Sequence, residues 1–240
     1  MPTPDDSPFF VGLELDDRPD LLEASFRLRY QVYCHERRFL SPSFYPDERE
    51  TDMFDAHAVH LGVVDRAGEL VATTRLVRRT QDGLPMFGHC SVLLRDPVLA
   101  DPDAALVEVS RLCVSRRYNR RQGDAHYALE GGTAAPGGRL RRAGGEIVMT
   151  LCRAAYQTSK RRGFQHWLAA TERSLQRLLT AYRLPFRQVG PPSDYFGLVA
   201  PYLMHIADFD AEILSGQLPA LQQFLDDLDP RFHPHPHRAS

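Results

Sequence analysis

The sequence LVEVSRLCV at residues 106–114 has the alternating pattern of a β-strand, yet it carries charged side chains in its interior. Because successive side chains of a strand point to opposite faces, the pattern predicts two sets. One face holds Leu106, Glu108, Ser110 and Leu112, and the other holds Val107, Val109, Arg111 and Cys113. Charges inside a strand are costly unless they are exposed or paired. Glu108 and Arg111 therefore lie either on a face open to water or in a functional site.

Segments on either side of this strand predict further strands. Val59–Val64 and Leu70–Val77 are rich in β-branched residues, and Asp65–Gly68 between them is typical of a hairpin turn. Arg75 places another charge inside a predicted strand. A strand is expected again at His166–Ala170.

The N-terminal part predicts a strand, a helix and a long connection. The strand is expected at Phe9–Leu15, and Asp17 or Asp20 caps a helix that ends near Arg37. Residues 80–105 hold three prolines and several aspartates, which predicts an irregular connection.

The C-terminal part alternates between helices and strands. Helices are expected at Ile147–Arg162 and Glu172–Arg183, and final strands at Phe186–Val189 and Leu198–Ile206. Pro201 suggests that the last strand lies at an edge or is irregular. The order of elements predicts an α/β protein with a mixed sheet.

Composition limits the possible classes of protein. The chain has 240 residues, 43% apolar and 25% charged, which suits one large α/β domain. A net charge of -2 argues against a dedicated nucleic-acid binder. The acids and prolines of residues 1–6 do not resemble a secretory signal, and no apolar run suits a transmembrane helix, so we expect a cytoplasmic protein. The four cysteines form no CxxC pair, so we expect neither a disulfide framework nor a thiolate zinc site.

We expect a single domain at residues 1–210, with a basic and flexible insertion at 116–145 that contains three Gly-Gly pairs. Residues 211–240 are expected to form a tail with a short helix at Leu218–Leu228 and a disordered, His-rich end. The arginines of the insertion that we single out are Arg116, Arg117, Arg120, Arg121, Arg141 and Arg142.

Polar residues gather at three places beside apolar segments. They are Arg29, Tyr33 and Phe39; Glu50, Asp52 and Asp55; and Arg75 with Glu108, Ser110 and Arg111. One interpretation is a metal hydrolase, because Asp52, Asp55, His57 and His60 offer ligands within nine residues. The two histidines lead into a predicted strand, however, where a spacing of three puts them on opposite faces.

Taken together, these residues resemble the acyl-homoserine-lactone synthases and their relatives, the N-acyl amino acid synthases and the acyltransferases of PEP-CTERM/exosortase systems. The likeness runs from Arg29 to Val114 and includes the E-x-D-x-x-D motif, a Met86-Phe87 pair and E-x-S-R at 108–111. Phe39 stands where the family has Trp, the insertion is longer than a lactone synthase needs, and no residue is assigned to S-adenosylmethionine. These departures favour the PEP-CTERM-associated acyltransferases over the autoinducer synthases.

The resemblance implies a GNAT fold, in which a twisted mixed sheet with helices on both faces splays apart between its fourth and fifth strands. It also implies an N-acyltransferase that moves a fatty acyl group from a phosphopantetheine thioester to the amine of a small acceptor such as an amino acid, with no tightly bound cofactor and no metal. Glu108, Ser110 and Arg111 are the expected catalytic residues, with Glu108 as general base. Expected substrate contacts are Arg29, Tyr33, Phe39, Asp52, Asp55, Arg75 and Phe87.

The basic insertion suggests the source of the acyl group. Acyl carrier protein is acidic, so an arginine-rich loop would attract it, although coenzyme A remains an alternative donor. Two other functions stay open: lactone synthesis from S-adenosylmethionine, and a non-catalytic domain of the same fold that binds an acyl chain or the carrier protein.

Overall fold

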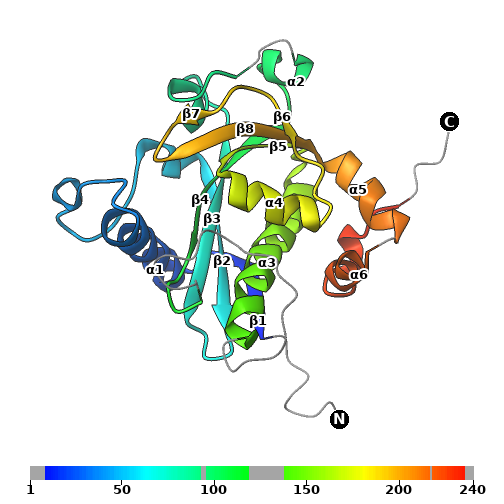
Figure 1. Cartoon of the computed structure of the whole chain (residues 1–240), viewed down its shortest axis with the longest axis horizontal. Coiled ribbons are helices and arrows are strands. Elements are labelled where there is room, and N and C mark those ends of the chain that lie inside the picture. The colour runs from blue at the N-terminus through cyan, green and yellow to red at the C-terminus, as the bar shows by residue number, and fades with distance from the viewer. Residues whose placement is uncertain (1–8, 93–95, 119–137, 217, 236–240) are drawn as a thin grey trace.

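The computed structural model describes residues 9–92, 96–118, 138–216 and 218–235, but not the side chains of 138–143 and 220. The strands are β1 Phe10–Glu14, β2 Ala58–Asp65, β3 Leu70–Arg78, β4 Leu106–Val114, β5 His166–Thr171, β6 Arg187–Gln188, β7 Ser193–Asp194 and β8 Leu198–His205. The α-helices are α1 Pro19–Tyr30, α2 Pro97–Ala100, α3 Gly138–Arg162, α4 Arg173–Ala181, α5 Ile206–Ser215 and α6 Pro219–Asp226. Figure 1 shows α3 lying along the sheet, with α5 and α6 beside the end of β8.

The described strands form one mixed sheet in the order β1-β2-β3-β4-β5-β8-β6, and β7 pairs with β8. All pairs are antiparallel except β4 with β5. A parallel pair needs a crossover, and α3 supplies it. The predicted α/β class, the hairpin and the strand at 106–114 are confirmed.

The sheet parts between its fourth and fifth strands. Leu106, Val107 and Glu108 pair with residues 166–168 of β5, and no further pair joins the two strands. Since β4 continues to Val114, its last six residues diverge from β5. The expected splaying is confirmed.

Alternation in the central strands separates two layers of side chains. Val59, Leu61 and Val63 of β2 belong to the apolar core that includes α3, as does Leu76 of β3. His60 and Arg75, which pair across β2 and β3, point to the opposite face, where α1 packs. The face under α1 is thus the polar one.

A β-bulge in β4 overturns part of the predicted alternation. Thr73 pairs with Cys113 but Arg75 pairs with Ser110, so one residue of β3 opposes two of β4. Arg111 lies at the bulge with φ of +54°, the left-handed region that residues other than Gly seldom adopt. The extra residue reverses the pattern beyond it, so Cys113 shares the face of Ser110, contrary to the prediction.

Three further expectations need correction. Of the two alternatives for the last strand, the edge position is wrong, because β5 pairs with one side of β8 and the short β6 and β7 with the other. The N-cap of α1 is Arg18, followed by Pro19, and neither predicted aspartate caps the helix. The helix expected from Ile147 begins at Gly138, so the end of the predicted insertion is helical. Residues 119–137 of that insertion lie outside the described part of the chain.

The connection at 80–105 also contains short helical turns, a 3₁₀ turn at Pro85–Gly88 and α2. Beyond Tyr30, the first helix continues as a π-helix, Gln31–Glu36, in which the N–H of Arg37 donates to the C=O of Val32. Within the ranges described here, no helix combines the length and the apolar character needed to cross a membrane.

The C-terminal helices belong to the main apolar core. Phe209 of α5 is fully buried, with its ring centroid 5.9 Å from that of Tyr156 of α3 and 5.3 Å from that of Phe224 of α6. Only one of the two helices was predicted from the sequence. Their packing makes this part of the predicted tail an integral layer of the fold.

We predict that Phe209→Ala lowers the free energy of unfolding by about 3–5 kcal/mol, the usual loss when a buried aromatic ring is removed. Leu214→Ala in the same helix is the matched control, because Leu214 is 43% exposed, and should change it by about 0.5 kcal/mol or less. Urea denaturation measures both. Equal, small effects would mean that α5 is not part of the cooperative unit.

Candidate active site

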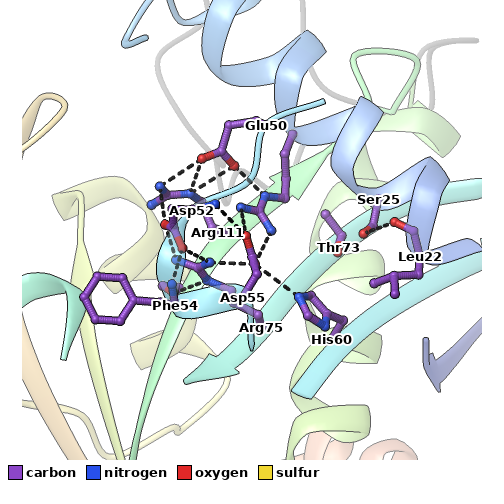
Figure 2. Close-up of polar contacts among 12 residues, drawn as sticks. Leu22, Ser25, Glu50, Asp52, Phe54, Asp55, His60, Thr73, Arg75 and Arg111 are labelled. Atoms are coloured by element: carbon purple, nitrogen blue, oxygen red, sulfur yellow. Dashed lines mark hydrogen bonds and ion pairs between the residues drawn. The ribbon is translucent and has the colours of Figure 1, made fainter. Parts of the chain in front are cut away.

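Two aspartates shape the loop before β2 by accepting hydrogen bonds from its backbone N–H groups. Asp52 Oδ1 accepts a hydrogen bond from the N–H of Phe54 at 2.9 Å, at the start of the 3₁₀ turn Met53–His57. Asp55 Oδ2 accepts from the N–H of Asp52 at 2.8 Å, which completes a capping box. The three-residue spacing in the motif therefore has a local cause, and it turns both carboxylates toward the arginines (Figure 2).

Arg29 reaches this loop from α1. Its Nε donates to Glu50 Oε2 at 2.5 Å, and Nη1 and Nη2 donate to the two oxygens of Asp55 at 2.7 and 3.0 Å. The backbone N–H of Glu50 also donates to the C=O of Phe26 at 3.1 Å. The side chain of Arg29 is only 1% exposed, so the loop is fastened to α1 by buried, charge-assisted hydrogen bonds.

Arg75 and Arg111 bring two more cations from β3 and β4. Arg75 Nη1 and Nη2 donate to the two oxygens of Asp52 at 2.6 and 2.7 Å, and Nη1 also donates to Asp55 Oδ1 at 2.6 Å. Arg111 Nη2 donates to Glu50 Oε1 at 3.0 Å and to Asp52 Oδ2 at 2.9 Å. We call these three arginines and three carboxylates the charge cluster, and Figure 2 shows its contacts.

The charge cluster favours the charged forms of its two aspartates. Burial alone would raise the pKa of Asp55, but hydrogen bonds from His60 and Arg29 hold that pKa well below its ordinary value. Burial would likewise raise the pKa of Asp52, and the bound guanidinium of Arg75 lowers it instead. Removing one member would leave a buried charge without its partner, which typically costs about 3–5 kcal/mol.

His60 extends the charge cluster toward the N-terminal segment. Its Nδ1 lies 2.9 Å from Asp16 Oδ1, and its Nε2 lies 3.1 Å from Asp55 Oδ1. Burial would lower the pKa of His60, but these two carboxylates raise it. His57, by contrast, is exposed. Across the described ranges, no three His, Cys, Asp or Glu side chains are arranged to hold a metal ion, so nothing there supports the metal-hydrolase interpretation.

A cavity of about 240 Å³ occupies the opening between β4 and β5. Its walls include Glu108, the diverging part of β4 from Val109 to Val114, and Trp167 to Thr171 of β5 apart from residue 168. Further lining residues come from both faces of the sheet: Val32, Tyr33 and Phe39 near α1, and Cys152, Leu175 and Leu179 on α3 and α4. The cavity therefore passes through the plane of the sheet.

Glu108 lines this cavity at the point where the strands separate. It is 2% exposed, and its Oε2 accepts a hydrogen bond from the N–H of Met86 at 2.9 Å. Burial raises the pKa of Glu108 to about 7, although the Met86 N–H and the charges of Arg75 and Arg111 oppose the shift. Ser110 also lines the cavity, and its Oγ accepts from Arg75 Nε at 3.2 Å.

Aromatic rings form the wall on the α1 side. The ring centroids of Tyr33 and Phe39 are 6.3 Å apart, those of Phe39 and Phe196 are 6.2 Å apart, and those of Phe196 and Tyr195 are 4.9 Å apart. The guanidinium carbon of Arg111 lies 5.5 Å from the centroid of Tyr33. We predicted Tyr33 and Phe39 from the sequence, whereas Tyr195 and Phe196 had no assigned role.

Some predicted substrate residues stand outside the cavity. Arg29, Asp52, Asp55 and Arg75 are not among its described lining residues, because they lie behind Arg111 in the charge cluster. Phe87 is not among them either.

Phe87 instead packs against a second apolar cluster, with the guanidinium of Arg79 5.2 Å from its ring centroid. The residue before it, Met86, supplies the backbone N–H that binds Glu108. The Met86-Phe87 pair therefore contributes a backbone N–H group to the site and not the side chain of Phe87.

The structure describes only some of the insertion arginines that we expect to attract acyl carrier protein. Arg116 and Arg117 are exposed, and Arg117 Nη1 donates to Glu69 Oε2 at 2.9 Å. Arg120 and Arg121 lie outside the described residues, and the side chains of Arg141 and Arg142 are not described.

Comparison with known proteins supports this architecture. Residues 28–128 match the family described as an acetyltransferase (GNAT) domain. No curated protein matches the chain at a significant level.

Solved structures with a similar fold include BjaI, a CoA-dependent acyl-homoserine lactone synthase with SAM and isopentyl-CoA. It is 18% identical with a TM-score of 0.61, over 91% of this chain and 99% of BjaI. FeeM, an N-acyl amino acid synthase from uncultured soil microbes, is 15% identical with a TM-score of 0.59, over 88% of this chain and 98% of FeeM. The AHL synthase LasI is 17% identical with a TM-score of 0.55, over 83% and 90% of the two chains. The expected GNAT fold is confirmed.

We predict that His60 makes stability depend on pH above about 6.5. Because its folded pKa is raised, its contribution is complete below about pH 6.5, the unfolded value, and is lost as the pH rises through the folded pKa. The free energy of unfolding should fall over that range by at most about 1.4 kcal/mol per pH unit. His60→Gln should remove this decline, while His57→Gln should keep it. Denaturant unfolding from about pH 6 to pH 9 measures it, and an unchanged slope in His60→Gln would contradict the assignment.

Proposed function

We propose that the chain is an N-acyltransferase that moves an acyl group from a phosphopantetheine thioester to the amine of a small acceptor. The observation that carries the proposal is Glu108, a buried carboxyl with a pKa raised to about 7, placed where β4 and β5 separate around a cavity. The GNAT domain match and the GNAT fold support the same class of reaction. The finer likeness to PEP-CTERM-associated acyltransferases stays a prediction.

The reaction is aminolysis of a thioester. The amine nitrogen attacks the carbonyl carbon, a C–N bond forms, the C–S bond breaks, and the products are an amide and a free thiol. An α-amine has a pKa of about 8, so most of it is protonated at neutral pH and cannot attack. Glu108 accepts the proton that the nitrogen loses, directly or through one water molecule, and the departing thiolate takes up a proton.

The environment of Glu108 suits a base that works near neutrality. A carboxylate with an ordinary pKa would be a weak base, and burial strengthens it here. The Met86 N–H binds Oε2 and fixes the orientation of the carboxyl group. Backbone N–H groups of the part of β4 that diverges from β5 are the candidate donors for the oxyanion of the tetrahedral intermediate.

In this proposal the charge cluster has a supporting role. It holds Arg111 and the loop at 50–57 in place, and Arg111 forms the wall of the cavity beside Glu108. Tyr33 and Phe39 present apolar surface to the acyl group or the acceptor.

We predict that Glu108→Gln keeps the fold but lowers kcat/KM for thiol release by 10²-fold or more, the usual size of base catalysis. In the wild type, kcat/KM should rise with pH through about 7 as Glu108 loses its proton. In Glu108→Gln, only the ionisation of the amine, near pH 8 for an α-amine, should remain. The assay follows free thiol from an acyl thioester in the presence of primary amines.

The control for this variant is Glu48→Gln, which changes an exposed carboxylate outside the cavity and should leave the rate unchanged. Near-wild-type turnover in Glu108→Gln would remove Glu108 from the mechanism. The absence of thiol release from the wild type with any amine would refute the proposed function itself.

We further propose that acyl carrier protein is the donor and that it docks on the arginines of the predicted insertion. Arg116 and Arg117 are exposed and follow the end of β4 after Ser115, and the diverging part of β4 lines the cavity. A cluster of cations at this point would attract an acidic carrier protein and direct its thioester into the opening.

We predict that raising the salt concentration from about 0.05 M to about 0.5 M raises KM for acyl carrier protein by tenfold or more, because salt screens charge attraction between the two surfaces. Replacing Arg120, Arg121, Arg141 and Arg142 by Glu should have a similar effect at low salt. An acyl thioester of N-acetylcysteamine, which carries no phosphate, is the control donor. Steady-state kinetics that show the same salt response for both donors would argue against docking on these arginines.

A further inference from the structure

An ion pair that the proposed mechanism does not use crosses the cavity. Arg37 follows the π-helix on the α1 side, and Glu172 is the N-cap of α4 at the end of β5. Both residues line the cavity, and Arg37 Nη2 donates to Glu172 Oε1. The pair therefore joins two elements that lie on opposite sides of the opening in the sheet.

Arg37 and Arg111 both line the cavity, but they differ in how many of their N–H donors are still available for a ligand. Arg111 is 13% exposed and is bound by both Glu50 and Asp52. Arg37 is 36% exposed, and within the described ranges one carboxylate oxygen, on Glu172, accepts a hydrogen bond from it. A guanidinium carries five N–H donors, so Arg37 retains most of its capacity to bind an anion.

The cost of exchanging its partner is low. Glu172 is 23% exposed, and ion pairs that water reaches contribute only about 0–1 kcal/mol. An incoming carboxylate bound to Arg37 through two parallel hydrogen bonds would be a stronger partner than the oxygen of Glu172 to which Arg37 Nη2 donates. The guanidinium carbon of Arg37 lies 4.9 Å from the ring centroid of Phe39, and this cation–π contact helps to hold the cation in place.

We propose that Arg37 determines acceptor specificity by binding a carboxylate of the acceptor, and that Glu172 holds the guanidinium in position until the acceptor arrives. The acceptor would then be an α-amino acid or a similar carboxylated amine. The carboxylate would lie at Arg37 and the amine would face Glu108, since both residues line the same cavity. This inference rests on the proposed function and narrows its acceptor class.

The experiment compares amines that differ only in the carboxylate. Phenylalanine, leucine and glycine are each tested against the amine without that group: phenethylamine, isoamylamine and methylamine. The donor is the acyl thioester of N-acetylcysteamine, because a phosphate on coenzyme A or on the carrier protein would be another anion for Arg37. The wild type should prefer at least one amino acid to its matched amine by tenfold or more in kcat/KM.

Arg37→Gln should lower kcat/KM for the preferred amino acid by roughly 10- to 100-fold, mainly through KM, the usual value of a hydrogen bond to a charged group. It should leave the matched amine unchanged, which also shows that the variant is folded. Arg38→Gln, which alters an exposed neighbour outside the cavity, should change neither. Equal loss with both acceptors, or a wild type without any preference, would overturn the proposal.

The double variant Arg37→Glu/Glu172→Arg separates recognition from bridging. It keeps an ion pair across the opening but moves the cation to the other wall, so the preference should still be lost. Full recovery of amino acid turnover would mean that the pair only ties two elements together.

Calorimetric titration of the wild type and Arg37→Gln with the same six compounds gives a readout that needs no turnover. Thiol release without a carboxylate preference would refute this inference alone, whereas no release with any amine would refute the proposed function.

Discussion

A buried network of hydrogen bonds between three guanidinium groups and three carboxylates joins α1 and the loop at 50–57 to the sheet. Its members come from α1, from the loop at 50–57, and from β3 and β4. Each carboxylate is bound by two arginines, so no single contact can be lost without disturbing the rest. Such an arrangement is a costly way to gain stability, because every charge must first leave water. What it provides is a fixed geometry for the strand that carries Glu108.

The balance of charge within this set also bears on the pKa of Glu108. Two arginines of the set act on Glu108, and cations normally lower the pKa of a carboxyl group. Burial nevertheless outweighs them, because both cations are already bound by carboxylates, and one of these, Asp52, acts in the opposite direction. The pKa of Glu108 is therefore raised even though two arginines lie near it. Because carboxylates already bind these arginines, they can shape the site without lowering the pKa of Glu108 to its ordinary value.

The sequence predicts the elements better than it predicts the side of the sheet on which each residue lies. β4 was bounded correctly from Leu106 to Val114, since alternation and β-branched residues are local properties. The bulge was missed, because a left-handed backbone is usually marked by Gly and here the residue is Arg111. The same reason explains the wrong face for Cys113.

The candidate site was predicted where its residues belong to a recognisable motif and missed where the fold brings in residues outside those motifs. Glu108, Ser110, Arg111, Tyr33 and Phe39 all line the cavity. Tyr195, Phe196 and Glu172 reach it from residues far along the chain, and no local pattern marks them. Phe87 was expected there because of its place in a motif, yet the motif acts through the main chain of the preceding residue. A motif fixes positions along the chain but not which atoms of each residue are used.

The short pairing between β4 and β5 has a mechanical consequence. Three residue pairs join the two strands, and Glu108 belongs to the last of them. The paired segment at 106–108 is therefore the pivot for any motion that separates the two strands. A rotation moves points least near its axis. If the strands moved apart to admit or release a bulky thioester, their unpaired ends would be displaced far more than the paired segment. Glu108, the proton acceptor of the proposed reaction, lies at the end of the opening where such a motion would displace it least.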